Sequence, residues 1–351
     1  MIPGELPPAS LRLRIDRQAL ADNWRYLDSV SASETATGAA IKANAYGLGV
    51  DVAIPALLEA GARDFFLAHW GEVPAALEHA EGSQLSVLHG VRTPAEAHFA
   101  RETSVLPVIN SVRQAALWSQ SGGGACHLMI DTGMNRLGIT AADVSDPAIQ
   151  ALDIEIAMSH LACADEASPN NVAQLARFRE CAQSVGARGL SLSNSAGLML
   201  GPDYHFDLTR PGIALYGGAP VKAMRGKIAQ VAYPEAAIIQ IRDLSPGDSV
   251  GYNATWTAER PMRAATVSLG YADGFLRALG RDGVLHHGDD TLPILGKVSM
   301  DMIIVDVTNS DVSERDFLSI PFDLPELSAR SGLSQYELLT VLGGRFDRTD
   351  G

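Results

Sequence analysis

The feature that most restricts the fold of this chain is a regular alternation of apolar runs and amphipathic stretches between residues 37 and 216. Eight short apolar runs recur every 20 to 30 residues, and the segments between them carry apolar residues at helical spacing. A strand followed by a helix, repeated eight times, is the pattern that closes a parallel barrel. We therefore predict an α/β fold, a (β/α)8 TIM-type barrel, for this part of the chain.

The sequence pattern changes after about residue 232, where apolar residues no longer recur at helical spacing. Beyond it, alternating apolar and polar residues are joined by turn residues, as in AAIIQIRDLSPGDSVGYN and TLPILGKVSMDMIIVDVT. This pattern predicts a mainly-β C-terminal domain. The expected partition is an N-terminal segment at 1–10 that can pair with the β domain, a barrel at 11–232 and a β domain at 233–351.

One helix is predicted near the end of the chain, over residues 328–342. The segment SARSGLSQYELLTVL has apolar residues at helical spacing. Ser331 or Ser334 can supply its N-cap, since serine hydroxyls accept from free amides at a helix start.

Composition and charge exclude several classes of protein. The net charge of −14 disfavours nucleic acid and anionic membranes as partners. No run approaches the roughly 18 uncharged apolar residues of a membrane helix, and MIPGELPPAS lacks the hydrophobic run of a secretory signal. We expect a soluble, cytoplasmic protein. Its three cysteines, histidine pairs and acidic runs lack the spacing of a disulfide framework or a metal site, so we expect no metal.

A polar residue stands late in each apolar run or just beyond it. In parallel barrels the active site is built at the C-terminal ends of the strands, so chemistry is expected among these side chains. For three of them, His69, His89 and Asn110, we expect only that a strand end tolerates a polar residue. The eight residues are Lys42, His69, His89, Asn110, Asp131, His160, Asn194 and Arg210.

Lys42 is the most informative of these residues. A lysine at this place is either a solvated surface charge or a nucleophile, and a partly buried amine has a lowered pKa and can form a Schiff base with an aldehyde. The following Tyr46, with glycines that let the backbone approach a ligand, favours pyridoxal phosphate held by both aldehyde and phosphate. Ser195 in SNSAG and the amides of Gly212 and Ile213 in RPGIALYG suit the same ligand.

Taken together, these motifs resemble the alanine racemase family over nearly the whole chain. That resemblance implies a β/α barrel followed by a β domain, the same partition that periodicity predicts. The motifs that carry it are AIKANAYGLG, DTGMNRLG, SHLACADE, SNSAG, RPGIALYGG, LGYADGF, GKVSMD and the tyrosine of YELL.

The resemblance implies roles for residues around pyridoxal 5'-phosphate. Lys42 would carry the cofactor covalently, and Arg210 would face the pyridine nitrogen, which stays unprotonated because a guanidinium does not give up its proton. The residues around the phosphate would be Tyr46, Ser195, Gly212, Ile213 and Tyr336.

Racemisation removes the α-proton from one face and returns it to the other, which calls for two bases. The resemblance assigns Lys42 to one face and Tyr271 to the other, with His160 and Arg210 as a hydrogen-bond chain that tunes the tyrosine. It also implies a homodimer in which the β domain of one subunit completes the site of its partner.

The same resemblance places three residues near the substrate alanine. Met300, through its backbone amide, and Asp301 would enter across the dimer interface, although Asp301 has an equally open structural reading. Arg136 would bind the substrate carboxylate with its planar fork of donors. Many relatives have a carbamylated lysine two residues before the aspartate of DTGMNRLG to orient this arginine, whereas this chain has Met129. Arg136 must then be held by an anion, Asn135 or another carboxylate, or be held loosely.

Other functions stay open at this point. The expected activity is interconversion of L- and D-alanine, with D-alanine supplied for peptidoglycan, and a racemase of serine or of a broader set of amino acids is the alternative. A fold-related decarboxylase would have an acidic residue near the pyridine nitrogen, where this chain has Arg210. A single-barrel carrier of pyridoxal phosphate would lack a second domain and the base Tyr271.

Overall fold

The structure, a computed structural model, describes residues 7–350 of the 351-residue chain. Its internal contacts divide it into two compact units. The barrel unit comprises Gln18–Ala229, and the β unit comprises the residues up to Arg17 together with those from Gln230 onward.

The barrel unit is built on short parallel strands of buried apolar residues. Strands β3 to β9 form one parallel sheet, in which each strand pairs with the next in chain order. The strands are β2 (Ala36–Thr37), β3 (Ala39–Ala40), β4 (Phe65–Leu67), β5 (Leu85–Val87), β6 (Leu106–Ile109), β7 (Ala125–Met129), β8 (Asp153–Met158), β9 (Gly189–Ser191) and β10 (Leu208–Thr209).

The barrel closes where its last strand returns to its first. Strand β10 pairs with β2 in parallel, and Gly38 joins β2 to β3 and donates to Thr209 O at 2.9 Å. On the other side, Asp207 N donates to Leu190 O of β9 at 3.0 Å. Since β2 and β3 run on as one strand, these bonds complete a ring of eight strands. The predicted (β/α)8 barrel is therefore confirmed.

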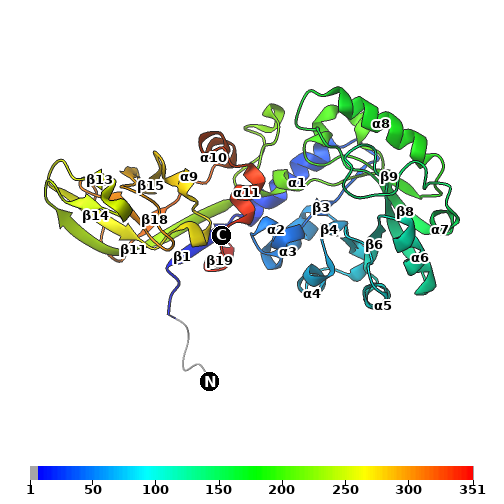
Figure 1. Ribbon diagram of the computed structural model, residues 1–351, viewed down its shortest axis with the longest axis horizontal. Helices are drawn as coiled ribbons and strands as arrows, with labels where there is room; N and C mark the ends of the chain where they lie inside the picture. Colours follow the sequence, from blue (N-terminus) through cyan, green and yellow to red (C-terminus); the bar gives the residue numbers. More distant parts are fainter. Residues whose placement is uncertain (1–6, 351) are drawn as a thin grey trace, which may run out of the picture. The chain divides into compact units, whose positions relative to one another are not determined.

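Helices cover the outside of the barrel strands (Figure 1). Four of them begin at a side chain that accepts from a free amide of the first turn: Thr93, Ser111, Asp146 and Ser168. The helices are α1 (Arg17–Val30), α2 (Lys42–Tyr46), α3 (Val50–Ala60), α4 (Val73–Leu77), α5 (Pro94–Thr103), α6 (Val112–Gln120), α7 (Pro147–Gln150) and α8 (Pro169–Ala182).

The core of the barrel unit includes a layer between strands and helices. Leu128 of β7 and Ile154 of β8 are buried in one cluster with Trp118 of α6 and Phe178 of α8. Burial of each such side chain contributes roughly 1.5–3 kcal/mol. This packing holds the strand ends, and hence the polar residues on them, in fixed positions.

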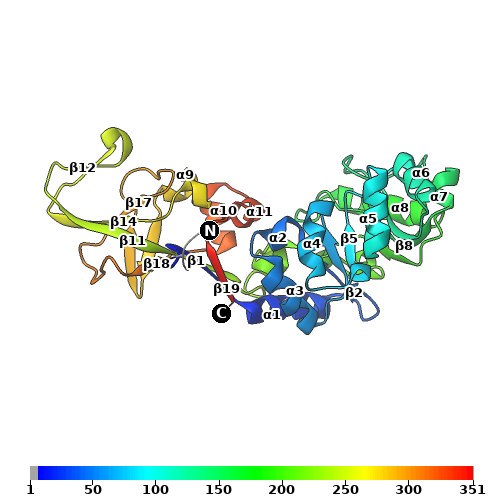
Figure 2. The same cartoon turned by 90° about the horizontal axis from the view of Figure 1, so that it is seen from below.

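The β unit consists mainly of antiparallel strands (Figure 2). Its sheet has the order β16, β15, β18, β11, β1, β19, and β14 joins it by pairing with β11 and β17. The elements are β1 (Leu11–Ile15), β11 (Ala232–Leu244), β12 (Ser249–Val250), β13 (Trp256–Thr257), β14 (Met262–Val267), α9 (Arg277–Gly280), β15 (Val284–His287), β16 (Asp290–Pro293), β17 (Ile303–Asp306), β18 (Phe317–Ser319), α10 (Leu324–Ser331), α11 (Gln335–Thr340) and β19 (Asp347–Asp350).

Strand β1 belongs to the β unit, whereas the expected partition assigned residues 11–17 to the barrel. It pairs antiparallel with β11 and parallel with β19, and its alternating burial places Leu11, Leu13 and Ile15 in the core. Within the expected N-terminal segment, Ser10 O accepts from Ala237 N at 2.8 Å, and residues 1–6 lie outside the described residues.

The expected single helix at 328–342 is in fact two helices. Helix α10 ends at Gly332, whose φ of 75° is left-handed, and α11 begins after Ser334, which accepts from Glu337 N. The apolar spacing continues past Gly332, but the left-handed glycine ends the first helix. In the part of the chain that the structure describes, no helix is long and apolar enough to cross a membrane.

Candidate active site

Lys42 opens a left-handed turn just beyond β3. The four residues after it have φ between 53° and 56°, and Gly47 follows with φ of 90°. Each left-handed residue other than glycine costs roughly 1–2 kcal/mol. Gly47 N donates to Ala43 O and Gly49 N to Asn44 O, both at 2.9 Å. Backbone strain of this kind concentrates at functional sites.

The surroundings of Lys42 favour its neutral amine. Burial lowers the pKa of Lys42, and the positive charges of Arg136 and Arg210 lower it further, while Glu72 acts in the opposite direction. A neutral amine is a nucleophile and a base. These surroundings favour the neutral form that the expected role of Lys42 requires.

Hydrogen-bond donors gather beside this turn, as a phosphate requires. Ser195 Oγ accepts from Gly212 N at 2.9 Å, which leaves its own proton free to donate. Ile213 N has no acceptor within residues 7–350. A Cβ on Gly212 would lie 2.2 Å from the Tyr46 hydroxyl, so only glycine fits there. Tyr46 stacks on Tyr216 with ring centroids 4.8 Å apart. These residues fit the phosphate of the predicted cofactor.

Arg210 lies buried inside the barrel. Its guanidinium donates to Ser191 Oγ and, at 2.6 Å, to Ser159 O, and its backbone amide donates to Ser193 O at 2.9 Å. Burial lowers the pKa of Arg210 to about 10, so it stays charged near neutral pH. The cation is therefore fixed in place by neighbouring strand ends.

His160 is half-buried beside these cations. Burial, followed by the charges of Arg210 and Arg136, lowers the pKa of His160 to about 3, so the ring is neutral. The sequence predicted a hydrogen bond between His160 and Arg210. The guanidinium instead donates to Ser191 and Ser159, and among the described residues it makes no hydrogen bond to the His160 ring.

Arg136 lies on a loop that one carboxylate organises. Asp131 Oδ1 accepts from the three amides of residues 133–135 at 2.9–3.1 Å, and Ile139 N closes the loop by donating to Met129 O at 2.9 Å. Met129 is buried. The Arg136 side chain is exposed and, within the described residues, makes no hydrogen bond or ion pair.

Two other predicted residues come together in the β unit. Tyr271 N donates to Ser299 O at 3.1 Å, and Ala272 N donates to Met300 O at 3.0 Å. A Cβ on Gly270 would lie 2.1 Å from Met300 O, which makes glycine necessary at this approach. The loop that carries Tyr271 is therefore joined to the loop that carries Met300.

Arg345 links the same two loops through side chains, and sequence reasoning missed it. Its Nε lies 3.2 Å from Asp273 Oδ1, and its Nη1 donates to Asp301 Oδ1 at 2.8 Å. Burial raises the pKa of Asp273, which is 1% exposed and also accepts from Gly270 N. In this structure Asp301 has a structural partner.

The predicted site residues thus form two groups, one in each unit. The barrel unit holds Lys42, Tyr46, Arg136, His160, Ser195, Arg210, Gly212 and Ile213, and the β unit holds Tyr271, Met300, Asp301 and Tyr336. Tyr336 lies on α11 and is 45% exposed. Sequence reasoning also missed Glu72, although a glutamate three residues after a helix start is a known capping signal.

Comparison with known proteins matches both units to one family. The alanine racemase N-terminal domain matches residues 15–220, and the alanine racemase C-terminal domain matches residues 231–350. The biosynthetic alanine racemase of Agrobacterium fabrum is 40% identical and covers 97% of this chain and 93% of its own. An alanine racemase of Cereibacter sphaeroides is 41% identical over 98% of this chain and 99% of its own.

Solved structures agree with the sequence comparison. The alanine racemase of Bartonella henselae, with covalently bound pyridoxal phosphate, has a TM-score of 0.87 and 34% identity, and the match covers 98% of this chain and 100% of the other. The biosynthetic enzyme of Pseudomonas aeruginosa has a TM-score of 0.84 and 29% identity, covering 98% and 100% of the two chains. The chain described here is a member of the alanine racemase family.

Proposed function

We propose that this protein interconverts L-alanine and D-alanine with pyridoxal 5'-phosphate as cofactor. The observation that carries the proposal is the half-buried amine of Lys42, whose surroundings favour its neutral form, on a turn that places Tyr46 against Gly212 and its hydrogen-bond partner Ser195. When bound, the cofactor draws electrons from the Cα–H bond of the amino acid and so makes the α-proton removable. Membership of the alanine racemase family supports the same activity.

In this proposal the barrel unit holds the cofactor. Lys42 would hold the cofactor covalently through its amine, and Ser195 Oγ and Ile213 N would donate to the phosphate. The amide of Gly212 donates to Ser195 Oγ and so orients that hydroxyl. The hydroxyls of Tyr46 and, from the β unit, Tyr336 would lie near the phosphate. The guanidinium of Arg210 would face the pyridine nitrogen. Because a guanidinium donates a hydrogen bond and keeps its proton, the nitrogen would stay unprotonated.

The two proton transfers are assigned to residues of the two units. The Lys42 amine would take or return the α-proton on one face, and the Tyr271 side-chain oxygen would do so on the other. Arg136 binds the substrate carboxylate with the help of Met300 N, while His160, kept neutral by burial, lies beside Arg210. Asp301 acts through its ion pair with Arg345.

We further propose that the protein works as a homodimer whose sites combine Lys42 of one subunit with the Tyr271 loop of the other. The supply of D-alanine for peptidoglycan stays a prediction. Relatives described as biosynthetic and catabolic in Agrobacterium fabrum are 40% and 39% identical to this chain, so identity does not separate the two roles.

The test of the activity is isotope incorporation. Incubation with L-alanine in heavy water should yield D-alanine that carries deuterium at the α-carbon, because the proton returned comes from solvent. Lys42→Ala should lower the rate by roughly 10³-fold or more, since it removes both the anchor and one base. Racemisation at the parental rate by Lys42→Ala would refute the assignment, and L-serine in the same assay measures the breadth of the substrate range.

A further inference from the structure

Glu72 joins two segments at the mouth of the barrel. Its Oε1 accepts from Ala43 N at 2.7 Å, and its Oε2 accepts from Ala68 N at 2.7 Å and His69 N at 3.4 Å. The side chain is 14% exposed. One carboxylate therefore connects the left-handed turn after Lys42 to the end of β4.

The hydrogen bond to Ala43 lies where the backbone is strained. Ala43 is the first residue of the left-handed turn, with φ of 55° and ψ of 45°, and its amide has a hydrogen-bond acceptor on Glu72. Hydrogen bonds from amides to a carboxylate are about twice as strong as those between neutral groups. Glu72 is thus well placed to offset the cost of the turn.

The charge of the Glu72 carboxylate also acts on the Lys42 amine. Burial, Arg136 and Arg210 lower the pKa of Lys42, and Glu72 raises it. Removal of this negative charge should therefore lower the pKa of the amine. The other titratable groups that share charge interactions with Lys42 are His89 and His160.

We propose that Glu72 is the positioning residue for Lys42, because it holds the left-handed turn in place and balances the charge around the amine. The proposal rests on the proposed function, in which Lys42 carries the cofactor. It assigns to Glu72 a role in the racemase reaction through another residue and not by contact with the substrate.

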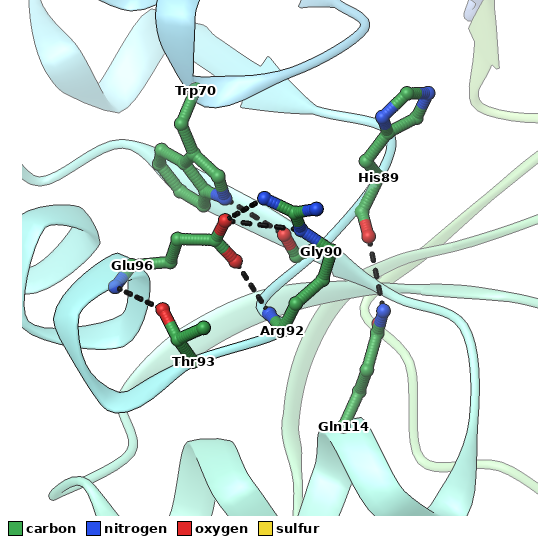
Figure 3. Close-up of polar contacts among 7 residues, drawn as sticks. All are labelled: Trp70, His89, Gly90, Arg92, Thr93, Glu96 and Gln114. Atoms are coloured by element: carbon green, nitrogen blue, oxygen red, sulfur yellow. Dashed lines mark hydrogen bonds and ion pairs between the residues drawn. The ribbon is translucent and has the colours of Figure 1, made fainter.

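A matched control lies one strand further along the barrel. Glu96 is also a half-hidden carboxylate, 14% exposed, that accepts from a loop amide, Arg92 N, at 2.6 Å. It pairs with the Arg92 side chain at 2.5 Å, and its own amide donates to Thr93 at the start of α5 (Figure 3). Figure 3 shows the ring of His89 pointing away from Glu96. Glu96 therefore matches Glu72 in burial and in accepting a hydrogen bond from a loop amide. It differs in having no hydrogen bond to the turn that follows Lys42.

Three variants separate the effect of Glu72 on the conformation of the turn from its effect on the charge around Lys42. Glu72→Gln keeps the length of the side chain but removes the charge and one acceptor. Glu72→Asp keeps the charge but is too short to bond to both segments. Glu96→Gln makes the same chemical change as the first variant at the control site.

Two measurements on the full chain distinguish them. The first is trace acetylation of Lys42 across a pH series after the cofactor is removed, with exposed Lys222 as internal reference. The second is the dissociation constant for added pyridoxal phosphate. Glu72→Gln should move the labelling midpoint of Lys42 to lower pH, while Glu72→Asp and Glu96→Gln should not. Both Glu72 variants should weaken cofactor binding about tenfold or more, as expected for loss of a charge-assisted hydrogen bond.

A second substitution tests the turn itself. Ala43 is exposed, and glycine adopts its left-handed conformation without strain. Ala43→Gly added to Glu72→Gln should restore much of the cofactor affinity and leave the labelling midpoint at the shifted pH. If Glu72→Gln alone does not fold, this double variant and Glu72→Asp supply the same comparison.

The proposal is overturned if Glu96→Gln weakens cofactor binding as much as the Glu72 variants, or if Glu72→Gln leaves both measurements at parental values. Borohydride reduction of the parental holoenzyme, followed by peptide mapping, separates this failure from that of the proposed function. A label on a residue other than Lys42 would refute the proposed function. A label on Lys42 with unaffected Glu72 variants would refute only the role of Glu72.

Discussion

At the scale of single residues, Arg136 is held by its loop, since its side chain has no hydrogen bond or ion pair with residues 7–350. Asp131 accepts from three consecutive amides just before Arg136, and such a nest of amides on a carboxylate fixes the backbone direction. Met129, buried beneath this loop, has a thioether that carries no charge to orient a guanidinium. The loop therefore sets where Arg136 emerges, and under the proposed function the substrate carboxylate would supply the anion.

This arrangement predicts activity that does not depend on a carbamate. Bicarbonate added to carbonate-free enzyme should leave kcat/KM unchanged, because residue 129 has no amine to react with carbon dioxide. Met129→Lys is the matched positive control, since a lysine buried there would be partly neutral and open to carbamylation. A severalfold restoration of activity by bicarbonate in the parental enzyme would contradict the prediction.

At the scale of elements, His127 ties three barrel strands together. The pairing of β7 with β8 is irregular between Cys126 and Leu128, and there Ile156 N donates to His127 Nδ1 at 3.2 Å. The opposite ring nitrogen, Nε2, lies 3.0 Å from Ser86 Oγ on β5. Since Nδ1 accepts, Nε2 carries the proton and donates. Burial lowers the pKa of His127 to about 3, so the neutral ring makes both hydrogen bonds.

This depressed pKa makes the barrel sensitive to acid. The unfolded chain binds a proton at His127 below pH 6.5 and the folded chain does not, so stability is fully present above that pH and is lost as pH falls toward 3. At pH 5.5 the loss is about 1.4 kcal/mol for this group. His127→Asn keeps an acceptor for Ile156 N and removes the titration. Its deficit in melting temperature should therefore be smaller at pH 5.5 than at pH 7.5, and equal deficits would count against this account.

The elements also show where sequence patterns suffice. The positions of Lys42 and Arg210 follow from periodicity, because each lies late in a short apolar run or just beyond it. The irregular pairing at His127 does not follow from periodicity, because a bulge depends on how the strand pairs with its neighbour. Gly332 illustrates a local signal that was outweighed by apolar spacing: a glycine favours a helix end, yet leucines continue at helical intervals on both sides of it.

At the scale of the whole molecule, the proposed homodimer makes a quantitative prediction. Lys42→Ala and Tyr271→Phe should each be inactive alone. If one site takes its lysine and tyrosine from different subunits, a hybrid dimer has one intact site, and an equal mixture after subunit exchange should recover about a quarter of the parental activity. Lys42→Ala mixed with the Lys42→Ala/Tyr271→Phe double variant is the control. Absence of recovery in an exchanged mixture would refute the sharing of sites.

Most of the architecture follows from the sequence. The features that do not are contacts between residues far apart in the chain. The eight-strand rhythm and the change of texture near residue 232 predicted both units. The assignment of β1 failed because its partners, β11 and β19, are more than 200 residues away, and one amphipathic strand carries no record of its neighbours. For the same reason the contacts of Glu72 and Arg345, which join separate loops, are visible only in the structure.

The pairing of β1 with β11 and β19 affects how the protein is made. Residues 11–15 leave the ribosome before their partners, which follow only after the whole barrel unit has been synthesised. The barrel unit is thus inserted within the sequence of the β unit, and β1 stays unpaired while the barrel is being made. Because β19 follows the other strands named here, the sheet around β1 is completed only after those strands have been synthesised.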